Sequence, residues 1–382
     1  MDKYAKNKAI AFGNDHANTL GVVQALGRKG ISVTAALWGS KTGIVASSVH
    51  TKRIVSGSNS EECIRNIIDS CKDNLPVVII PCCDEAAVVL EKFEPELVPD
   101  FLFQKCRNST LKELASKDLQ ARLAKESGID IPWTIEIQSV ADIPEDITFP
   151  CITKPVVSTE GLTSDILVCY DRDGLIRTVE NIIHRTRRLL VQQYIEKDSD
   201  YGVVGCRFSN GCVSVPDIIT RTDLYPPKTG LGTVYSLDVL NDDHIKEGII
   251  SFLEKIDYVG LFSFEYAKSK LDGKYYFIEA NFRNDGENPC LVKAGLNIHY
   301  AHYCDLIGEA FDLPQIHSHT AISEVRHFRS LTHRNITLKK WISDLRSKDS
   351  FMSYYPEDKG PFRRIVGNLF LSKFHLRKNE SY

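Results

Sequence analysis

The stretch Leu261-Phe-Ser-Phe-Glu-Tyr-Ala267 and the later stretch Tyr275-Tyr-Phe-Ile-Glu-Ala-Asn281 decide the fold of this chain. Both are rich in the aromatic and β-branched residues that favour strands. Between them, Lys270-Leu-Asp-Gly-Lys274 contains an Asp-Gly pair, which is a strong turn signal. The sequence therefore predicts two antiparallel strands joined as a hairpin.

Two registers of this hairpin place its acidic residues differently. If the loop has three residues, Leu271 to Gly273, with Gly273 in the left-handed conformation, Glu265 lies directly opposite Glu279. A two-residue Asp-Gly loop instead places Glu265 opposite Ala280. In the first register the two carboxylates are roughly 5 Å apart on one sheet face, where they repel each other unless a cation lies between them.

Two further polar side chains, Asn281 and Arg283, share the strand face of Glu279, because side chains alternate along a strand. Two carboxylates and an amide oxygen suit Mg²⁺ (or Mn²⁺) that holds nucleotide phosphates. Arg283 offers a planar fork for a phosphate or carboxylate. The pattern predicts a metal site formed by Glu265, Glu279 and Asn281, and the alternative is a surface hairpin with solvated acids.

The composition is that of an ordinary soluble protein. The chain has 382 residues, which predicts two or three lobes at roughly 100 to 200 residues per domain. It is 43% hydrophobic and 25% charged with a formal net charge of -3, so its charge does not indicate nucleic acid as a partner. The apolar runs are far shorter than the ~20 residues of a membrane-spanning helix.

The cysteines indicate a reducing compartment. There are 11 of them, an odd number, and they show no metal-ligand spacing. The N-terminus, Met1-Asp-Lys-Tyr-Ala-Lys6, lacks the apolar core of a secretion signal. We therefore expect reduced thiols and a cytoplasmic protein.

The N-terminal part of the chain alternates between strands and helices. Lys8–Phe12 and Ile31–Ala36 are expected strands around a helix from Val22 to Lys29, and Pro76–Pro81 is a further strand. This order predicts a parallel sheet whose carboxyl ends form the functional edge. The loop Gly13–Gly21 is not GxGxxG, so we expect this lobe to position a substrate, and an NAD-dependent oxidoreductase is disfavoured.

The middle of the chain begins with a charged helix and a strand that ends in lysine. The helix is expected from Leu111 to Ser127, with Gly128 placed as its C-cap. In the strand Phe149–Pro155, the proline that follows Lys154 restricts the backbone. Such a lysine can contact phosphate, and the alternative is a solvated strand end.

Together these motifs resemble the ATP-grasp superfamily, specifically its carboxylate-amine ligases related to carbamoyl-phosphate synthetase and D-aspartate ligase. The resemblance implies a mixed α/β and α+β fold, in which an N-terminal Rossmann-like pre-ATP-grasp lobe precedes the ATP-grasp domain. The implied boundaries are 1–108 for the first lobe, 109–310 for the ATP-grasp domain (small lobe 109–190, large lobe 191–310) and 311–382 for a basic C-terminal extension.

The resemblance also implies a nucleotide site. Lys117 and Lys154 correspond to the phosphate-binding lysines, and Asp200 to the residue that binds the ribose. The adenine hinge corresponds to Leu190–Ile195, for which the alternative is a plain buried strand. Within the hinge, the cofactor-binding residues are Gln192 at the exocyclic amine, then Gln193, and Tyr194 and Ile195 at the ring through backbone groups.

The implied reaction has two steps. ATP phosphorylates a substrate carboxylate while Mg²⁺ and the basic residues offset the developing charge. An amine then attacks the acyl phosphate and expels phosphate, which gives an amide and needs no nucleophilic side chain. In agreement, His16, His184 and His299 belong to no catalytic motif, and we expect them to be structural or at the surface.

Two departures from the family pattern bear on the site. The phosphate loop Val157–Ser164 contains a single glycine, so it is expected to be stiffer than usual. Ser263 stands where members that join D-alanine carry an arginine. The positive charge would then come from Arg283 or Arg221, the two implied catalytic residues.

The substrates implied are a small-molecule carboxylate and an amine. Asp217–Thr233, with Arg221 and Lys228, is either a clamp for a carboxylate or a solvated linker, and Asn284–Asn288 could orient the amine. By resemblance, an amino acid is added to a cell-envelope precursor, a sugar acid or a small peptide. The alternative is a nonenzymatic nucleotide-binding regulatory module with an ATP-grasp-like fold.

The region after residue 311 is basic. Between Arg326 and Lys348 it has seven Lys or Arg (326, 329, 334, 339, 340, 346 and 348) and one acid, Asp344. Such a region can rest on an anionic membrane or bind a lipid-linked substrate, and the alternative is helices packed on the main body. A homodimer is also compatible with the sequence.

Overall fold

The computed structural model describes residues 6–39, 41–71, 75–155, 166–186, 188–226 and 231–379. The chain forms two compact units. The large unit comprises Met1–Gly128, Asp200–Glu265 and Glu279–Tyr382, and the small unit comprises Ile129–Ser199 and Tyr266–Ile278. Residues 109–128 and the C-terminal extension therefore both lie in the large unit.

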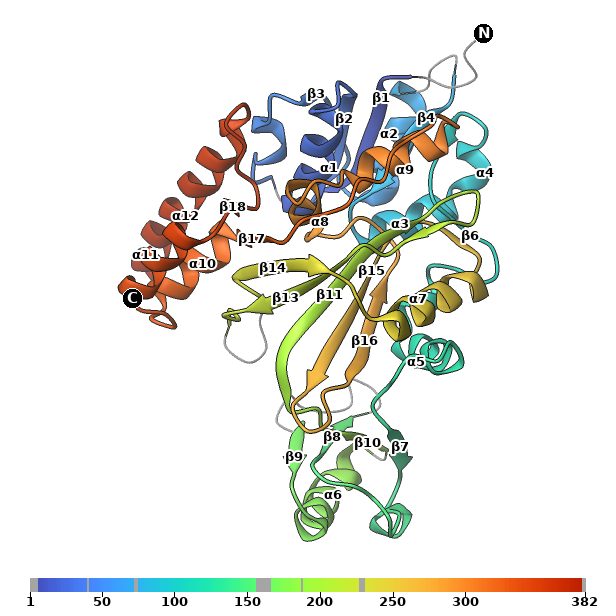
Figure 1. The fold of residues 1–382 in the computed structure, drawn as a ribbon, viewed down its shortest axis with the longest axis vertical. Helices are drawn as coiled ribbons and strands as arrows, with labels where there is room; N and C mark the ends of the chain where they lie inside the picture. The colour runs from blue at the N-terminus through green and yellow to red at the C-terminus, as the bar shows by residue number, and fades with distance from the viewer. Residues whose placement is uncertain are drawn as a thin grey trace. The chain divides into compact units, whose positions relative to one another are not determined.

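The N-terminal lobe of the large unit is built on a parallel sheet with the order β3-β2-β1-β4-β5 (Figure 1). Its strands are β1 (Lys8–Asn14), β2 (Ser32–Trp38), β3 (Thr51–Ser56), β4 (Val77–Pro81) and β5 (Phe101–Leu102). Its helices are α1 (Ala17–Gly27), α2 (Ser60–Ser70), α3 (Asp84–Lys92) and α4 (Glu94–Leu97), with the 3₁₀ turn η1 (Val45–Ser47). The Rossmann-like lobe and the mixed fold class are thus confirmed.

Both faces of this sheet are buried, because alternate residues of β1 enter different cores. Ala9 and Ala11 pack with α1, whereas Ile10 and Phe12 pack with α2 and α3. Continuous apolar strands of this kind are typical of a parallel sheet covered by helices on both sides.

Two boundaries differ from the sequence-based expectation. Helix α1 begins at Ala17, not Val22, and includes Gly21, where an added Cβ would lie 3.2 Å from Pro289. Glycine has a low helix propensity, but here it allows a neighbouring helix to approach closely. The expected helix Leu111–Ser127 is shorter, because residues 113–115 form a separate 3₁₀ turn, η2.

A second sheet of the large unit has the order β16-β15-β11-β13-β14-β17-β18, with β12 beside β11 and β6 beside β15. Its strands are β6 (Lys105–Cys106), β11 (Lys197–Arg207), β12 (Val213–Ser214), β13 (Asp217–Thr222), β14 (Val234–Val239), β15 (Tyr258–Ser269), β16 (Tyr275–Asn281), β17 (His319–Ile322) and β18 (Ser350–Phe351). Strands β11, β15 and β16 also contribute residues to the small unit. The associated helices are α5 (Lys117–Glu126), α7 (Asp243–Lys255), α8 (Asn288–Lys293) and α9 (Ile298–Leu306).

The small unit contains an antiparallel sheet with the order β7-β10-β8-β9. Its elements are β7 (Thr134–Ile137), η3 (Val140–Asp142), β8 (Cys151–Pro155), β9 (Leu167–Cys169), α6 (Arg172–Thr186) and β10 (Leu189–Gln193). Leu175, Val179 and Ile182 of the amphipathic helix α6 pack on the buried side of this sheet. The expected phosphate loop Val157–Ser164 lies outside the described residues.

The hairpin predicted from the sequence is present, but its loop is longer than either predicted form. The Ser269 N–H donates to the Lys274 carbonyl at 2.9 Å, so the loop has four residues, Lys270 to Gly273. Gly273 has the expected left-handed conformation, with φ 73°. The Ser269 hydroxyl accepts from the Leu271 N–H at 3.2 Å and thereby stabilises the first residues of the loop.

The C-terminal extension is packed on the large unit rather than separate from it. Its helices are α10 (Glu324–Thr332), α11 (Leu338–Ser347) and α12 (Lys359–Asn379), and its strand β17 pairs with β14 (Figure 1). The buried Asp358 accepts hydrogen bonds from Gln24 and Ser48 of the N-terminal lobe at 2.9 and 2.6 Å. In the part of the chain that the structure describes, none of the helices has the length and apolar character needed to span a bilayer.

Candidate functional site

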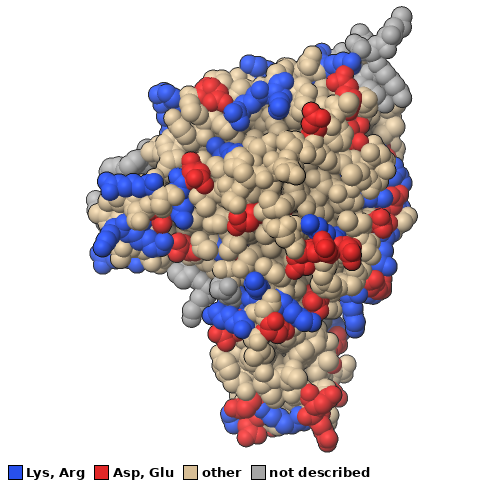
Figure 2. Space-filling model, in the orientation of Figure 1, with Lys and Arg blue, Asp and Glu red and all other residues tan. Residues whose placement is uncertain are grey.

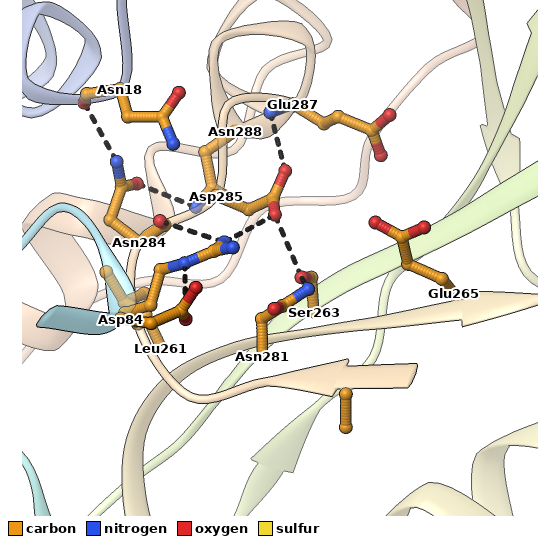
Figure 3. Close-up of polar contacts among 12 residues, drawn as sticks. Asn18, Asp84, Leu261, Ser263, Glu265, Asn281, Asn284, Asp285, Glu287 and Asn288 are labelled. Atoms are coloured by element: carbon orange, nitrogen blue, oxygen red, sulfur yellow. Dashed lines mark hydrogen bonds and ion pairs between the residues drawn. The ribbon is translucent and has the colours of Figure 1, made fainter. Parts of the chain in front are cut away.

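The hairpin acids line one cavity of the large unit. Glu265 on β15 and Glu279 and Asn281 on β16 all face a cavity of about 930 Å³, together with Arg221 and Arg283. The structure therefore brings together the three predicted metal-binding residues and the two predicted catalytic arginines. Figure 3 shows Glu265 and Asn281 near the acidic segment that follows β16.

Arg221 is shared between two carboxylates. It lies on β13 and is 5% exposed, with Nη1 2.9 Å from Oε2 of Glu265 and Nε 2.5 Å from Oε1 of Glu287. Burial alone would lower the pKa of Arg221, but the carboxylates of Glu287 and Glu265 raise this pKa well above its usual value. Burial raises the pKa of Glu287 to about 7. Arg221 offsets this rise only in part, because its charge is shared with Glu265.

A glycine on β11 makes room for this arrangement. Oε2 of Glu287 is buried and has no hydrogen-bond partner among the described residues. A Cβ added at Gly202 would lie 2.2 Å from this oxygen and 2.9 Å from Nη2 of Arg221. Only glycine therefore fits beside the Arg221–Glu287 pair.

Glu279 is positioned by the helix that begins at Lys117. Ser116 caps α5 by accepting a hydrogen bond from the Leu119 N–H. Nζ of Lys117, the first helical residue, lies 3.2 Å from Oε2 of Glu279. Gln120 binds both backbone groups of Ala280, at 2.8 and 2.9 Å, so α5 and β16 are held in register.

Arg283 is held in place by two carboxylates. Its Nε lies 3.1 Å from Asp84, at the carboxyl end of the parallel sheet, and its Nη1 lies 2.7 Å from Asp285. Burial alone would raise the pKa of Asp285, but the charge of Arg283 keeps this pKa below its usual value. The guanidinium is thus held in a fixed position between two carboxylates.

Ser263 connects the acidic segment to the predicted metal residues. Its hydroxyl donates to Asp285 at 2.9 Å and accepts from Nδ2 of Asn281 at 3.3 Å (Figure 3). The amide nitrogen of Asn281 is therefore engaged within the protein. The sequence alone marked Ser263 only as a departure, included Asp285 only in a segment expected to orient the amine, and gave no role to Gln120.

The oxygen donors at this site fit Mg²⁺. Two carboxylates and one amide oxygen face the same cavity, and hard cations prefer such ligands. Within the described ranges, no group of three or more His, Cys, Asp or Glu side chains could hold a metal without other ligands. Mg²⁺ sites that hold nucleotides commonly use one or two carboxylates and complete the coordination with phosphates and water.

The expected phosphate and adenine residues of the small unit form a polar row. Nζ of Lys154 donates to Gln192 at 2.8 Å, and Nε2 of Gln192 donates to Thr134 at 2.8 Å. Gln193 donates to the Tyr276 hydroxyl at 3.3 Å.

The hinge ends just beyond β10. The Tyr194 N–H donates to the Pro150 carbonyl at 3.0 Å. Asp200, expected at the ribose, lies on β11 opposite Arg221. It belongs to the large unit, whereas the hinge belongs to the small unit.

Other predicted residues have mainly structural surroundings. Asn284 is buried and donates to the Asn18 carbonyl at 2.9 Å (Figure 3), and its oxygen contacts His299 at 2.6 Å. Burial lowers the pKa of His299 to about 3, so it is neutral, in agreement with a structural role. His16, in contrast, lines the cavity. Lys228 of the expected clamp is outside the described residues.

The chain is similar to solved structures over most of its length. N5-carboxyaminoimidazole synthetase from Staphylococcus aureus has 12% identity and a TM-score of 0.63, covering 84% of this chain and 82% of that chain. The chain has an ATP-grasp fold. An L-amino acid ligase from Bacillus licheniformis shares this ATP-grasp architecture with 15% identity and a TM-score of 0.56, covering 83% of this chain and 79% of that chain.

A third structure with the same ATP-grasp fold is the biotin carboxylase domain of thermophilic 2-oxoglutarate carboxylase bound to ADP. It has 18% identity and a TM-score of 0.62, and the match covers 84% of this chain and 74% of that chain. No protein-family model matches the sequence, and no curated protein matches it either. The resemblance predicted from the motifs is thus confirmed at the level of the fold.

Proposed function

We propose that this protein is an ATP-dependent carboxylate-amine ligase. The observation that carries the proposal is the convergence of Glu265, Glu279 and Asn281 with Arg221 and Arg283 in one cavity of an ATP-grasp fold. Names of the similar structures include an amino acid ligase and a carboxyaminoimidazole synthetase, and both names describe synthetic enzymes. This agreement supports a reaction that joins a carboxylate to an amine.

ATP is proposed to bind with its phosphates near Lys117 and Lys154. Gln192, Gln193, Tyr194 and Ile195 would contact the adenine, and Asp200 the ribose. Glu265, Glu279 and Asn281 would hold Mg²⁺, which supplies charge compensation to the phosphates when bound. The ion pair between Lys117 and Glu279 supports a common site for the phosphates and the metal.

The carboxylate oxygen of the substrate attacks the γ-phosphorus of ATP, and the bond to the β-γ bridging oxygen breaks, which releases ADP. Arg283, fixed by Asp84 and Asp285, stabilises the negative charge on the transferred group. The amine nitrogen then attacks the acyl carbon, phosphate leaves with the bonding electron pair, and the nitrogen loses a proton. If Glu265 held the metal, Arg221 would still have Glu287 as its partner.

We further propose that an amino acid is joined to a cell-envelope precursor, a sugar acid or a small peptide in the cytoplasm. Incubation with ATP, Mg²⁺ and pools of carboxylic and amino acids tests this, with ADP and phosphate as the expected products. Release of AMP and pyrophosphate would contradict an acyl-phosphate reaction. The Glu279→Gln variant serves as the control, because it removes one metal carboxylate.

A nonenzymatic nucleotide-binding module is the second candidate. It is favoured by one observation, namely that both predicted metal acids are already neutralised by Arg221 and Lys117. This candidate predicts saturable ATP binding that is insensitive to Mg²⁺ and no turnover with any substrate pool. The ligase predicts that Mg²⁺ strengthens ATP binding.

A further inference from the structure

The cavity that holds the hairpin acids has a second wall that is basic and has no role in the steps above. Arg326 and Arg329 of α10, Arg364 of α12, and Lys41 and His16 of the N-terminal lobe line it. Figure 2 shows Lys and Arg side chains gathered at the left of the view, where Figure 1 places α10, α11 and α12. Three separate parts of the large unit therefore direct positive charge to one cavity.

These cations differ from the other arginines of the cavity, because carboxylates do not neutralise them. Arg326 is half-buried, and its Nη1 donates to the neutral hydroxyl of Tyr235 at 2.5 Å. Arg364 donates to the Thr42 carbonyl at 2.9 Å. Among side chains that the structure describes, no acid forms an ion pair with Arg326, Arg329 or Lys41.

The basic residues of the extension thus fall into two classes. Lys340, on α11, has the pattern of a structural cation, with Nζ 2.9 Å from Asp223 and 3.2 Å from Asp344. Arg326 and Arg329 lie on the neighbouring α10 and face the cavity instead. A cation that is half-buried without an anionic partner is costly unless a ligand supplies the anion.

Beside Arg326, His16 adds no charge of its own, but the N-terminal end of α1 adds positive potential. Burial, and next Arg326, lower the pKa of His16, so these two side chains lie close to each other. His16 is the N-cap of α1 and forms no capping hydrogen bond, which leaves the positive end of this helix open toward the cavity.

The acid nearest in sequence does not cancel this charge. Glu324, also on the cavity wall, accepts a hydrogen bond from the Ser353 N–H at 2.7 Å, and burial raises its pKa to about 7. Tyr235 lies close to Arg326 and also to Glu287 and Arg221. The basic wall and the hairpin acids are therefore within reach of one ligand, in a cavity of ordinary ligand size.

We propose that Arg326, Arg329 and Lys41 bind a second anionic group of the substrate, a phosphate or an additional carboxylate. The role of this group as part of a substrate rests on the proposed ligase function. The substrate of the reaction is then at least dianionic before it is activated, because one carboxylate reacts while the second anion is held by α10. The C-terminal extension is thereby part of the substrate site.

The test measures anion binding directly, with inorganic phosphate and malonate as probes. Each is titrated calorimetrically at constant ionic strength into the full-length protein, both alone and saturated with Mg²⁺ and a nonhydrolysable ATP analogue that fills the γ-phosphate position. The variants are Arg326→Gln and Arg329→Gln. Arg346→Gln is the matched control, because Arg346 is exposed on α11 and does not line the cavity.

We expect saturable binding of one probe to the nucleotide-loaded protein, weakened about tenfold or more by each α10 variant and unchanged by the control. The preferred probe distinguishes phosphate from carboxylate. Arg329 is exposed, so its variant is expected to fold normally even if Arg326→Gln is destabilised. Absence of saturable binding, or equal weakening by Arg346→Gln, would overturn the proposal.

Two outcomes separate this proposal from the ligase function. If the ATP analogue binds but neither anion does, only the anion site is wrong. If the analogue does not bind, the ligase proposal fails, and the titration of the protein alone still decides the anion site. A separate assay measures co-sedimentation of the protein with phosphatidylglycerol vesicles. If Arg346→Gln and Arg329→Gln weaken this binding equally, the basic residues form a membrane-facing surface instead.

Discussion

Replacing Gly202 by alanine tests whether the Arg221–Glu287 pair organises the site. The added Cβ would lie 2.2 Å from Oε2 of Glu287, so the carboxylate has to move by roughly 1 Å, which disturbs its 2.5 Å bond to Arg221. Overpacking costs ~1–3 kcal/mol, and breaking a buried ion pair costs ~3–5 kcal/mol. Because Arg221 retains its ion pair with Glu265, we expect a loss of ~2–4 kcal/mol in the free energy of unfolding.

The assay is urea unfolding of Gly202→Ala, Glu287→Ala and the double variant. If the cost arises from the Glu287 carboxylate, Gly202→Ala destabilises the Glu287→Ala background by less than it destabilises the wild type. Gly367→Ala is the control, because no atom lies within 4 Å of its added Cβ and alanine favours the helix. A loss below ~0.5 kcal/mol for Gly202→Ala would refute the reasoning.

Three other perturbations have defined outcomes. Lys117→Met should change the unfolding free energy by less than ~0.5 kcal/mol, because the side chain is 76% exposed, yet raise the KM for ATP at least severalfold in a steady-state assay. Ser263→Ala should lower stability by ~1–2 kcal/mol and weaken Mg²⁺-dependent nucleotide binding, measured by calorimetry, because Asn281 and Asp285 lose a shared partner. Glu324→Gln should flatten the pH dependence of stability. Because burial raises the folded-state pKa of Glu324 to about 7, from 4.5 in the unfolded chain, its contribution is complete below pH 4.5 and is lost as the pH rises through about 7, by at most ~3 kcal/mol in denaturation curves. An unchanged KM for ATP in Lys117→Met would contradict the first prediction, and unaltered Mg²⁺-dependent binding in Ser263→Ala would contradict the second. A pH profile of stability in Glu324→Gln that matches the wild type would contradict the third.

The hairpin shows how far the sequence could predict the site. Strand composition and the Asp-Gly pair indicated two antiparallel strands and the left-handed Gly273, and both are present. The sequence did not predict the loop length, because this length depends on a hydrogen bond between the Ser269 hydroxyl and the loop backbone. Both predicted loop lengths were therefore wrong, although the acids do share one cavity.

Interactions between distant segments were beyond sequence reasoning. Arg221 and Glu287 are 66 residues apart, and no local sequence pattern in either segment predicts their contact. Asp84 follows the strand Pro76–Pro81, whose carboxyl end was expected at a functional edge. Its role as a partner of Arg283, however, depends on how the parallel sheet meets the segment after β16. In the same way, the sequence marked the basic extension, yet only the packing of α10 separates cavity-lining arginines from structural cations such as Lys340.

The central claim is that the two hairpin acids exchange their internal cations for a nucleotide-bound metal. A crystal structure of the protein with Mg²⁺ and a nonhydrolysable ATP analogue tests it most directly. We predict Mg²⁺ at about 2.0–2.1 Å from oxygens of Glu265, Glu279 and Asn281, with the phosphates on its open side. A nucleotide bound while Glu265 stays on Arg221 and Glu279 stays on Lys117, with no metal between them, would contradict the account.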